Sequence, residues 1–198
     1  MRVISGRFKG VALTTPKSGT RPTTDRTKEA IFSHLDSWGV LDDARVLDLF
    51  AGTGALGIEA LSRGARELVA VESSAPAAAL IAQTLTALKH NRSWEHGMSA
   101  RVVKARAEKY AASASAVEPF GMVFIDPPYA FETNDCNQLL ADLASRELTS
   151  SNTVIMLERS TRSEAPTAPA NWEITDRRDY GETAVYYICL LYTSDAAD

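Results

Sequence analysis

Short apolar runs alternate with stretches of helical periodicity over most of the chain, from Arg45 onward. The apolar runs are expected as strands, at residues 45–50, 67–72, 100–104, 120–126, 152–158, 172–179 and 184–190. The stretches between them place apolar residues three and four apart, as Ile81, Leu85 and Leu88 are placed, and are expected as helices at 56–63, 75–89, 105–112 and 134–146. Strands that alternate with helices predict a parallel sheet covered on both faces.

The last two strands break this alternation, because only a short turn around Gly181 separates them. They are expected to form an antiparallel hairpin at one edge of the sheet. We therefore predict an α/β fold with a Rossmann-like sheet of seven strands, five of them parallel and two in a C-terminal hairpin. This layout is typical of class I S-adenosylmethionine-dependent methyltransferases, whereas a dinucleotide-binding fold would more often continue with parallel units.

The amino-terminal residues do not follow the alternation. Val3, Phe8 and Val11 lie among glycines and basic residues, which predicts a short β-hairpin arm rather than a core element. Residues 15–24 form a turn-rich connector, in which Pro22 favours an extended Arg21. We predict a basic arm over residues 1–22.

A helix is expected after this connector. Thr24 or Asp25 is a suitable N-cap, and Ile31, Leu35 and Trp38 are spaced along one face. This helix would open a single methyltransferase domain that spans residues 23–188, a length that suits one compact core.

The last ten residues, CLLYTSDAAD (189–198), depart from the preceding pattern. They resemble the translated end of a transposon adapter used in sequencing libraries. We expect the gene's own coding sequence to stop near Ile188, so residues 189–198 stay outside the functional interpretation.

Basic residues are concentrated near the amino terminus, although the net charge of the chain is −4. Residues 1–30 contain seven Lys or Arg and two acids, and the rest of the chain contains 14 Lys or Arg and 23 acids. A basic segment on an acidic body indicates a surface that meets a polyanion, with a solvated arm as the alternative.

The composition gives little support to other functional classes. Cys136 and Cys189 are the only cysteines and the three histidines are scattered, so neither a disulfide framework nor a metal site is predicted. No apolar run approaches the roughly 18 residues of a membrane span, and the first residues lack the apolar stretch of a signal peptide. We expect a cytoplasmic, soluble protein with no membrane partner.

A glycine-rich turn follows the first strand, in the sequence VLDLFAGTGALG (46–57). Gly52, Gly54 and Gly57 also satisfy a dinucleotide fingerprint, so the glycines alone leave the cofactor open. Asp48 narrows the choice, because a carboxylate would repel a pyrophosphate but would attract the ammonium of a methionine moiety. Glu72, at the end of the second strand, can accept both ribose hydroxyls in either cofactor class.

A second motif, Asp126-Pro127-Pro128-Tyr129, follows the strand at 120–126. Two prolines cannot continue a sheet ladder, so they predict a rigid turn at the carboxyl ends of the strands, where a cofactor would lie. Asp126 and the Pro127 carbonyl can accept the two hydrogens of an exocyclic amine, while Tyr129 stacks on the base. Holding both hydrogens turns the amine lone pair toward the methyl donor, and this positioning would supply much of the rate.

These motifs together resemble the bacterial RsmD family, the guanine-N2 methyltransferases of small-subunit (16S) ribosomal RNA. The resemblance covers nearly the whole chain up to residue 188, and it is carried by RVISGRFKG (2–10), RPTTDRTKEAIF (21–32), VLDLFAGTGALGIEALSRGA (46–65), VFIDPPY (123–129), PANW (169–172) and YGET (180–183).

The resemblance implies S-adenosyl-L-methionine as cofactor and assigns roles residue by residue. The implied cofactor contacts are Arg21, Thr23, Asp48, Phe50, Ala51, Gly52, Thr53, Gly54, Glu72 and the backbone of Ala107. The implied catalytic residues, which hold the guanine, are Asp126, Pro127, Pro128 and Tyr129. Basic residues implied to follow rRNA phosphates are Arg2, Arg7, Lys9 and Arg26.

One position departs from the family pattern. After the third strand the family usually offers an acid or an amide to the adenine, whereas this chain has Ala105-Arg106-Ala107. The backbone N–H of Ala107 can still reach the base. The expected partner is 16S rRNA within an assembling small ribosomal subunit, and the enzyme is expected to be a monomer.

Three alternatives remain at this point. A DNA adenine-N6 methyltransferase also uses a DPPY motif, but it normally carries a substantial target-recognition domain, and only about 40 residues precede the first strand here. A nicotinamide-dependent oxidoreductase would use the three glycines, but Asp48 and the DPPY motif argue against it. An RNA-binding protein without catalysis is disfavoured by the intact motifs.

Overall fold

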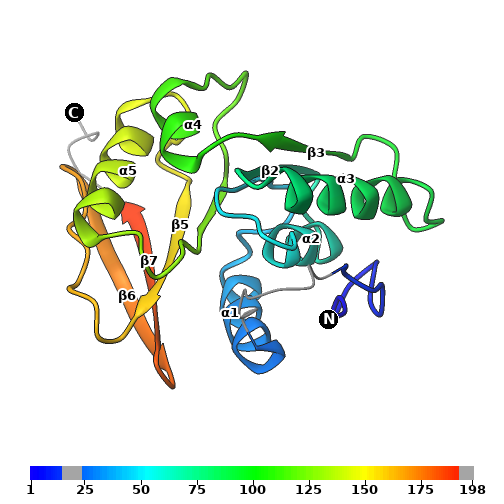
Figure 1. Cartoon of the computed structure of the whole chain (residues 1–198), viewed down its shortest axis with the longest axis horizontal. Coiled ribbons are helices and arrows are strands. Elements are labelled where there is room, and N and C mark those ends of the chain that lie inside the picture. Colours follow the sequence, from blue (N-terminus) through cyan, green and yellow to red (C-terminus); the bar gives the residue numbers. More distant parts are fainter. Residues whose placement is uncertain (15–23, 192–198) are drawn as a thin grey trace, which may run out of the picture.

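The computed structural model describes residues 1–14 and 24–191, and these contain five helices and seven strands (Figure 1). The helices are α1 (Asp25–Trp38), α2 (Ala55–Ser62), α3 (Ala75–Lys89), α4 (Ala107–Ser113) and α5 (Thr133–Ser145). The strands are β1 (Arg45–Asp48), β2 (Glu67–Glu72), β3 (Ser99–Lys104), β4 (Met122–Ile125), β5 (Val154–Ser160), β6 (Trp172–Tyr180) and β7 (Thr183–Leu190).

The strands form one sheet in the order β3-β2-β1-β4-β5-β7-β6, which confirms the predicted fold class. Strands β1 to β5 are parallel, and β7 pairs antiparallel with both β5 and β6. The chain reverses its direction along the sheet between β1 and β4, which is where an open α/β sheet leaves a crevice for ligands. In register, Asp48 at the end of β1 lies between Ala70 of β2 and Phe124 of β4. We call this side of the sheet, where β1 to β5 end, the carboxyl edge.

Helices cover both faces of the sheet, as the alternating pattern predicts. One core cluster joins α1, α2 and α3 to the sheet through residues such as Phe32, Ile58 and Ile81. The other joins α4 and α5 through residues such as Ala111 and Leu140. Figure 1 shows α4 and α5 grouped beside β5 to β7, with α2 and α3 next to β2.

Residues 1–14, which we call the N-terminal segment, correct one prediction: they were expected as an arm outside the core, but they belong to it. Val3, Phe8 and Leu13 are at most 5% exposed and pack in the cluster that contains α1 and α2. A bridge between Arg2 and Ala12 gives the segment the outline of the predicted hairpin. Three apolar residues separated by glycines carry no periodicity, so the sequence pattern could not reveal this burial.

The C-terminal part of α2 holds the N-terminal segment in place. The carboxylate of Glu59 accepts hydrogen bonds from the backbone N–H groups of Ile4 (2.8 Å) and Ser5 (3.1 Å). Ser62 Oγ donates to the Ser5 carbonyl (2.6 Å) and accepts from the Phe8 N–H (2.9 Å). These long-range bonds satisfy backbone groups that burial would otherwise leave unpaired.

A buried ion pair completes this attachment. Lys28 of α1 is 1% exposed and Glu59 is fully buried, and their Nζ and Oε1 atoms are 3.3 Å apart. Arg63 Nε donates to Glu59 Oε2 at 3.1 Å, and its Nη groups reach Glu29 and Asp36, each at 2.9 Å. The Lys28 ammonium also donates to the Arg2 carbonyl at 3.3 Å. Each charge in this group therefore has a partner.

Element boundaries differ from the predictions by a few residues. Of the two N-cap candidates, Thr24 and Asp25, Thr24 is the N-cap of α1, and its side chain accepts a hydrogen bond from the Thr27 N–H. Trp38, expected on the buried face, is 41% exposed and packs at the surface against His34 and Tyr187. Strand β7 continues through Leu190, two residues beyond the expected end of the native sequence at 188, while residues 192–198 are outside the described residues.

Candidate active site

The glycine turn between β1 and α2 has the backbone conformation that only glycine adopts easily. Gly52 and Gly54 have φ values of 58° and 81°, in the left-handed region. Gly54 is the N-cap of α2 and supplies no side-chain capping bond. At Gly57, a Cβ would lie 2.5 Å from Leu68 Cδ1 of β2, so a larger residue there would require the Leu68 side chain to shift. The turn thus brings the start of α2 close to the end of β1.

Asp48 lies under this turn and is 1% exposed. Its Oδ2 accepts a hydrogen bond from the Gly57 N–H at 3.1 Å, whereas its buried Oδ1 has no hydrogen-bond partner among the described residues. Burial raises the pKa of Asp48 to about 7, and the nearby charges of Asp126 and Glu72 act in the same direction, while the Gly57 bond opposes them. A buried carboxylate with one unused oxygen is suited to pair with a cation.

Glu72, at the end of β2, is tied to the same turn. Its Oε1 accepts from the Gly52 N–H at 3.0 Å, and its Oε2 accepts from the Ser74 N–H at 2.8 Å. A carboxylate has about four lone-pair positions, so each oxygen can still accept one further hydrogen bond. Glu72 therefore positions the glycine turn and keeps two acceptor positions that a ligand could use.

The DPPY motif forms a turn directly after β4, as predicted. The Phe131 N–H donates to the Pro128 carbonyl at 2.9 Å, and Tyr129 is 80% exposed, with its ring available for stacking. The rings of Phe50 and Phe131 meet edge to face, with centroids 5.2 Å apart. Because Phe50 follows β1, this contact brings the segment that contains the DPPY turn against the glycine turn at the carboxyl edge.

The segment after β3 also lies at the carboxyl edge. Arg106 is the N-cap of α4 and pairs with Glu108 at 2.7 Å, and Ala107 is buried. A surface cavity of about 380 Å³ is lined here by Ser73, Lys104, Ala105, Arg106 and Lys109. Arg106 stands where the family usually has an acid or an amide, and the cavity next to the end of β2 is therefore lined by basic residues, without an acid or amide.

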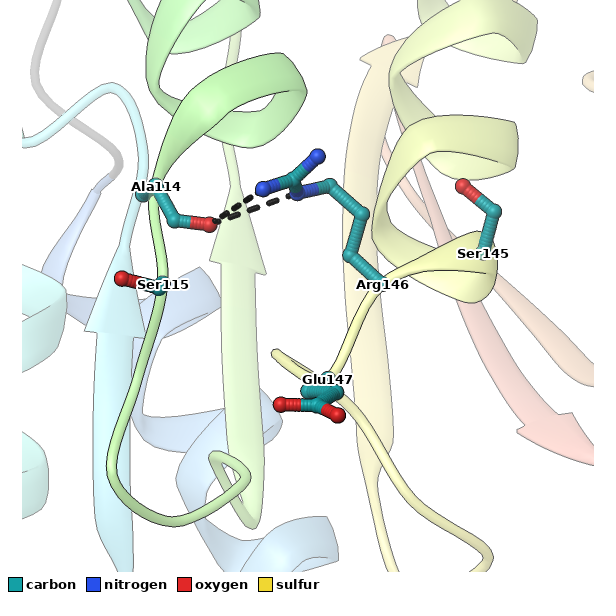
Figure 2. A pocket seen from close by; sticks show the side chains of 5 residues that line it. All are labelled: Ala114, Ser115, Ser145, Arg146 and Glu147. Atoms are coloured by element: carbon teal, nitrogen blue, oxygen red, sulfur yellow. Dashed lines mark hydrogen bonds between the residues drawn. The ribbon is translucent and has the colours of Figure 1, made fainter.

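A second cavity, of about 210 Å³, lies at the opposite edge of the sheet (Figure 2). It is lined by Ala114, Ser115, Ser145, Arg146 and Glu147, which lie at or just after the ends of α4 and α5 and precede β4 and β5. Arg146 fills part of it and donates from Nε and Nη2 to the Ala114 carbonyl, at 3.3 and 2.9 Å. None of the predicted site residues contributes to this cavity.

The basic residues implied to meet RNA differ in their surroundings. Arg2, Lys9 and Arg26 are exposed. The Arg7 side chain is only 18% exposed; its Nη1 lies 3.2 Å from Glu95 Oε2 and its Nη2 donates to the Ala65 carbonyl at 3.3 Å. Arg7 therefore already helps to hold the N-terminal segment. The implied cofactor residues Arg21 and Thr23 are outside the described residues.

Sequence reasoning missed one charged residue at this edge. Arg159, the second-last residue of β5, is 8% exposed; its side-chain Nε is buried without a hydrogen-bond partner, and its side chain forms no ion pair with a described residue. Its only signal in the sequence is a Glu-Arg pair that closes the apolar run VIML.

The described residues contain no cluster of ligands for a metal ion and no helix long and apolar enough to span a membrane.

Comparisons with known proteins agree on one family. The family model described as Conserved hypothetical protein 95 matches residues 1–189. Ribosomal RNA small subunit methyltransferase D of Escherichia coli K12 is 34% identical over 185 residues, which cover 93% of this chain and 87% of that protein. The protein of the same name from Haemophilus influenzae is 31% identical over 183 residues, or 91% of this chain and 89% of that protein.

Solved structures share the fold. The Escherichia coli protein yhhF superposes with a TM-score of 0.82 and 32% identity, covering 98% of this chain and 99% of that one. The magnesium protoporphyrin IX methyltransferase of Synechocystis, solved with bound S-adenosylmethionine, superposes with a TM-score of 0.62 over 88% of this chain and 87% of that one. At 13% identity, this second likeness concerns the fold alone.

Proposed function

This chain belongs to the RsmD family, the family of ribosomal RNA small subunit methyltransferase D, and on that premise we propose that it methylates 16S ribosomal RNA. The reaction would transfer a methyl group from S-adenosylmethionine to the exocyclic N2 amine of a guanine. The observation that carries the proposal is the joining of two motifs, a glycine turn over a buried acid and a DPPY turn, through the Phe50–Phe131 contact.

The residues of the glycine turn fit S-adenosylmethionine. The unused Oδ1 of Asp48 is an acceptor for the cofactor's ammonium, and Glu72 keeps two acceptor positions for the ribose hydroxyls. Gly52 has open space where a Cβ would stand, so its backbone can be approached closely. When bound, the cofactor supplies an electrophilic methyl group on a sulfonium.

The residues of the DPPY turn would hold the acceptor. The Asp126 carboxylate and the Pro127 carbonyl accept the two amine hydrogens, and the exposed Tyr129 ring stacks on the guanine. The nitrogen lone pair then points toward the methyl group, and the rate comes from this orientation. Asp126 is also the carboxylate that can take the proton which the amine sheds after it is methylated.

The substrate we propose is 16S rRNA within an assembling small ribosomal subunit, which implies a cytoplasmic enzyme. The exposed Arg2, Lys9 and Arg26 would follow RNA phosphates. We further propose that the enzyme acts as a monomer.

The decisive experiment maps methylated nucleosides by mass spectrometry. Unmethylated 16S rRNA, free and assembled into small subunits, is incubated with the protein and S-adenosylmethionine, and N2-methylguanosine is expected at one position. N6-methyladenosine as the product would replace the assignment by an adenine methyltransferase. Calorimetry with S-adenosylhomocysteine and with NAD gives an independent check, and preferential NAD binding would contradict the proposal.

A further inference from the structure

Arg159 is a largely buried arginine whose side chain has no counter-charge among the described residues. The residue is 8% exposed, its Nε is buried with no hydrogen-bond partner, and no described acid lies within ion-pair distance. Removing a guanidinium from water without pairing it is unfavourable by several kcal/mol, so native proteins rarely leave one in this state. By contrast, Arg63 of the same chain has three carboxylate partners.

The position of Arg159 relates it to the site. In the ladder between β4 and β5, Ile125 pairs with Leu157. Extending this register by two residues sets Arg159 beside Pro127 of the DPPY turn. Side chains alternate along a strand, so Arg159 shares the face of Leu157, which packs with α5, whereas Glu158 points to the other face.

The start of α5 is the neighbour on that face. Cys136, in the first turn of α5, and Leu157 of β5 belong to the same core cluster, so the face of β5 that carries Arg159 packs against the start of α5. In agreement, burial raises the pKa of the Cys136 thiol, and the positive charge of Arg159 opposes this rise. The N-cap residue, Glu132, makes no side-chain capping bond. Asp135 also lies in the first turn of α5, and neither of these acids forms an ion pair with Arg159, so the guanidinium can still bind an anion from outside the protein.

We propose that Arg159 is a positioning residue that binds a phosphate of the RNA backbone next to the target guanosine. The proposal rests on the proposed function, because it takes the DPPY turn as the place where the guanine lies. The cofactor's carboxylate is a less suitable anion, since β4 separates Arg159 from the glycine turn after β1. A bidentate guanidinium–phosphate contact would fix the nucleotide while Asp126 holds its amine.

The test compares Arg159→Gln, Arg159→Lys and the wild type on unmethylated small subunits. In Arg159→Gln the KM for the subunit should rise about tenfold, as expected for one lost charge-assisted contact, while kcat changes much less. The slope of log affinity against log salt should become shallower by about 0.7–0.9, the value for one phosphate. Arg159→Lys should restore most of the affinity, and the affinity for S-adenosylhomocysteine should not change.

Stability separates this role from a structural one. The melting temperature of Arg159→Gln should equal or exceed that of the wild type, because an unpaired buried charge has been removed. Arg162→Gln is the matched control: Arg162 lies three residues further on, is 84% exposed and pairs with Glu182 at 3.4 Å, so its loss should leave KM and the salt slope unchanged.

Other outcomes would overturn the inference. An unchanged KM and salt slope in Arg159→Gln would remove Arg159 from RNA binding, and weaker binding of S-adenosylhomocysteine would reassign it to the cofactor. A lower melting temperature with unchanged RNA affinity would make it structural. The proposed function fails separately, because in that case the wild-type protein would methylate no guanine of the subunit.

Discussion

The two ends of α2 meet buried charges that the protein treats in opposite ways. At the C-terminal end, Lys28 and Glu59 are buried together, and Arg63 and two backbone N–H groups donate to the remaining acceptor positions of the Glu59 carboxylate. At the N-terminal end, Asp48 is buried with one oxygen unused. Two strands further along the carboxyl edge, the Arg159 side chain is buried, and its Nε has no partner among the described residues.

This difference separates scaffold from site. A fully paired group of charges fixes the N-terminal segment, α1 and α2 in one arrangement, and nothing remains for a ligand to bind. An incompletely paired charge lowers the stability of the free protein and is compensated when a ligand supplies the missing partner. Substitutions at the first group should therefore change stability, and substitutions at the carboxyl edge should change binding or catalysis.

The largest effect is expected at the scaffold end. Glu59→Leu leaves the ammonium of Lys28 buried without its carboxylate and removes the acceptor of the Ile4 and Ser5 N–H groups. The free energy of unfolding should fall by about 3–5 kcal/mol, as measured by urea denaturation. Glu29→Gln is the control, because Glu29 is 48% exposed and shares the partner Arg63, and it should change stability by less than about 1 kcal/mol. Equal losses in the two variants would contradict the scaffold role.

The next effect tests the acceptor half of the site. Asp126→Ala removes one of the two groups proposed to hold the amine, so methyl transfer should fall by about 10²-fold or more. Calorimetry should give an unchanged affinity for S-adenosylhomocysteine, and urea denaturation a nearly unchanged stability. Turnover close to that of the wild type would exclude Asp126 from the mechanism.

A smaller effect is expected at Asp48. Asp48→Asn keeps the size of the side chain but removes the negative charge, so affinity for S-adenosylmethionine should fall about tenfold. Stability at pH 8 should not fall, because the substitution also removes a buried charge. Loss of stability with unchanged cofactor affinity would move Asp48 to the scaffold.

The raised pKa of Asp48 should make both the stability of the protein and its affinity for the cofactor depend on pH. The folded protein holds the Asp48 proton up to about pH 7, whereas an unfolded Asp releases it near pH 4. Between these values the folded state binds more protons, so this group makes stability fall as pH rises. Cofactor affinity should rise over the pH range around 7, because the ionised carboxylate pairs with the ammonium. Asp48→Asn should lose both trends, as followed by calorimetry and urea denaturation from pH 5 to 8.

The smallest effect distinguishes two basic residues of the N-terminal segment. Lys9 is exposed, so Lys9→Ala should weaken RNA binding slightly and make its salt slope shallower by about 1, with unchanged stability. Arg7 contacts Glu95 and the Ala65 carbonyl, so Arg7→Ala should lower the melting temperature. The reverse result would show that Arg7 is the RNA contact and Lys9 is not.

The sequence predicted the features that depend on neighbouring residues. Alternating apolar runs predicted the sheet and its terminal hairpin, because strand and helix periods are local. The ends of those runs located Asp48 and the DPPY turn, since parallel strands bring their carboxyl ends to one edge. That rule implies that the two motifs lie side by side, but it does not predict the contact between the rings of Phe50 and Phe131.

Features that depend on distant residues could not be predicted in this way. Glu59 lies in a helical stretch where an acid normally faces solvent, and only the approach of Ile4 and Lys28 explains its burial. The N-terminal segment was expected outside the core because its apolar residues show no period. Arg159 ends an apolar strand as surface residues often do, and its missing partner is visible only when α5 and β5 are packed together.

The attachment of the N-terminal segment has a consequence for synthesis of the chain. Ile4 is bound by Glu59, 55 residues later, and at about 5–20 residues per second the ribosome adds that acceptor roughly 3–11 s after Ile4 itself. Val3 and Phe8 pack in a core cluster that includes residues of α2, such as Ile58, so this packing is also incomplete until α2 has been made. The N-terminal segment can therefore take its final place only after the end of α2 has been made, well after its own residues.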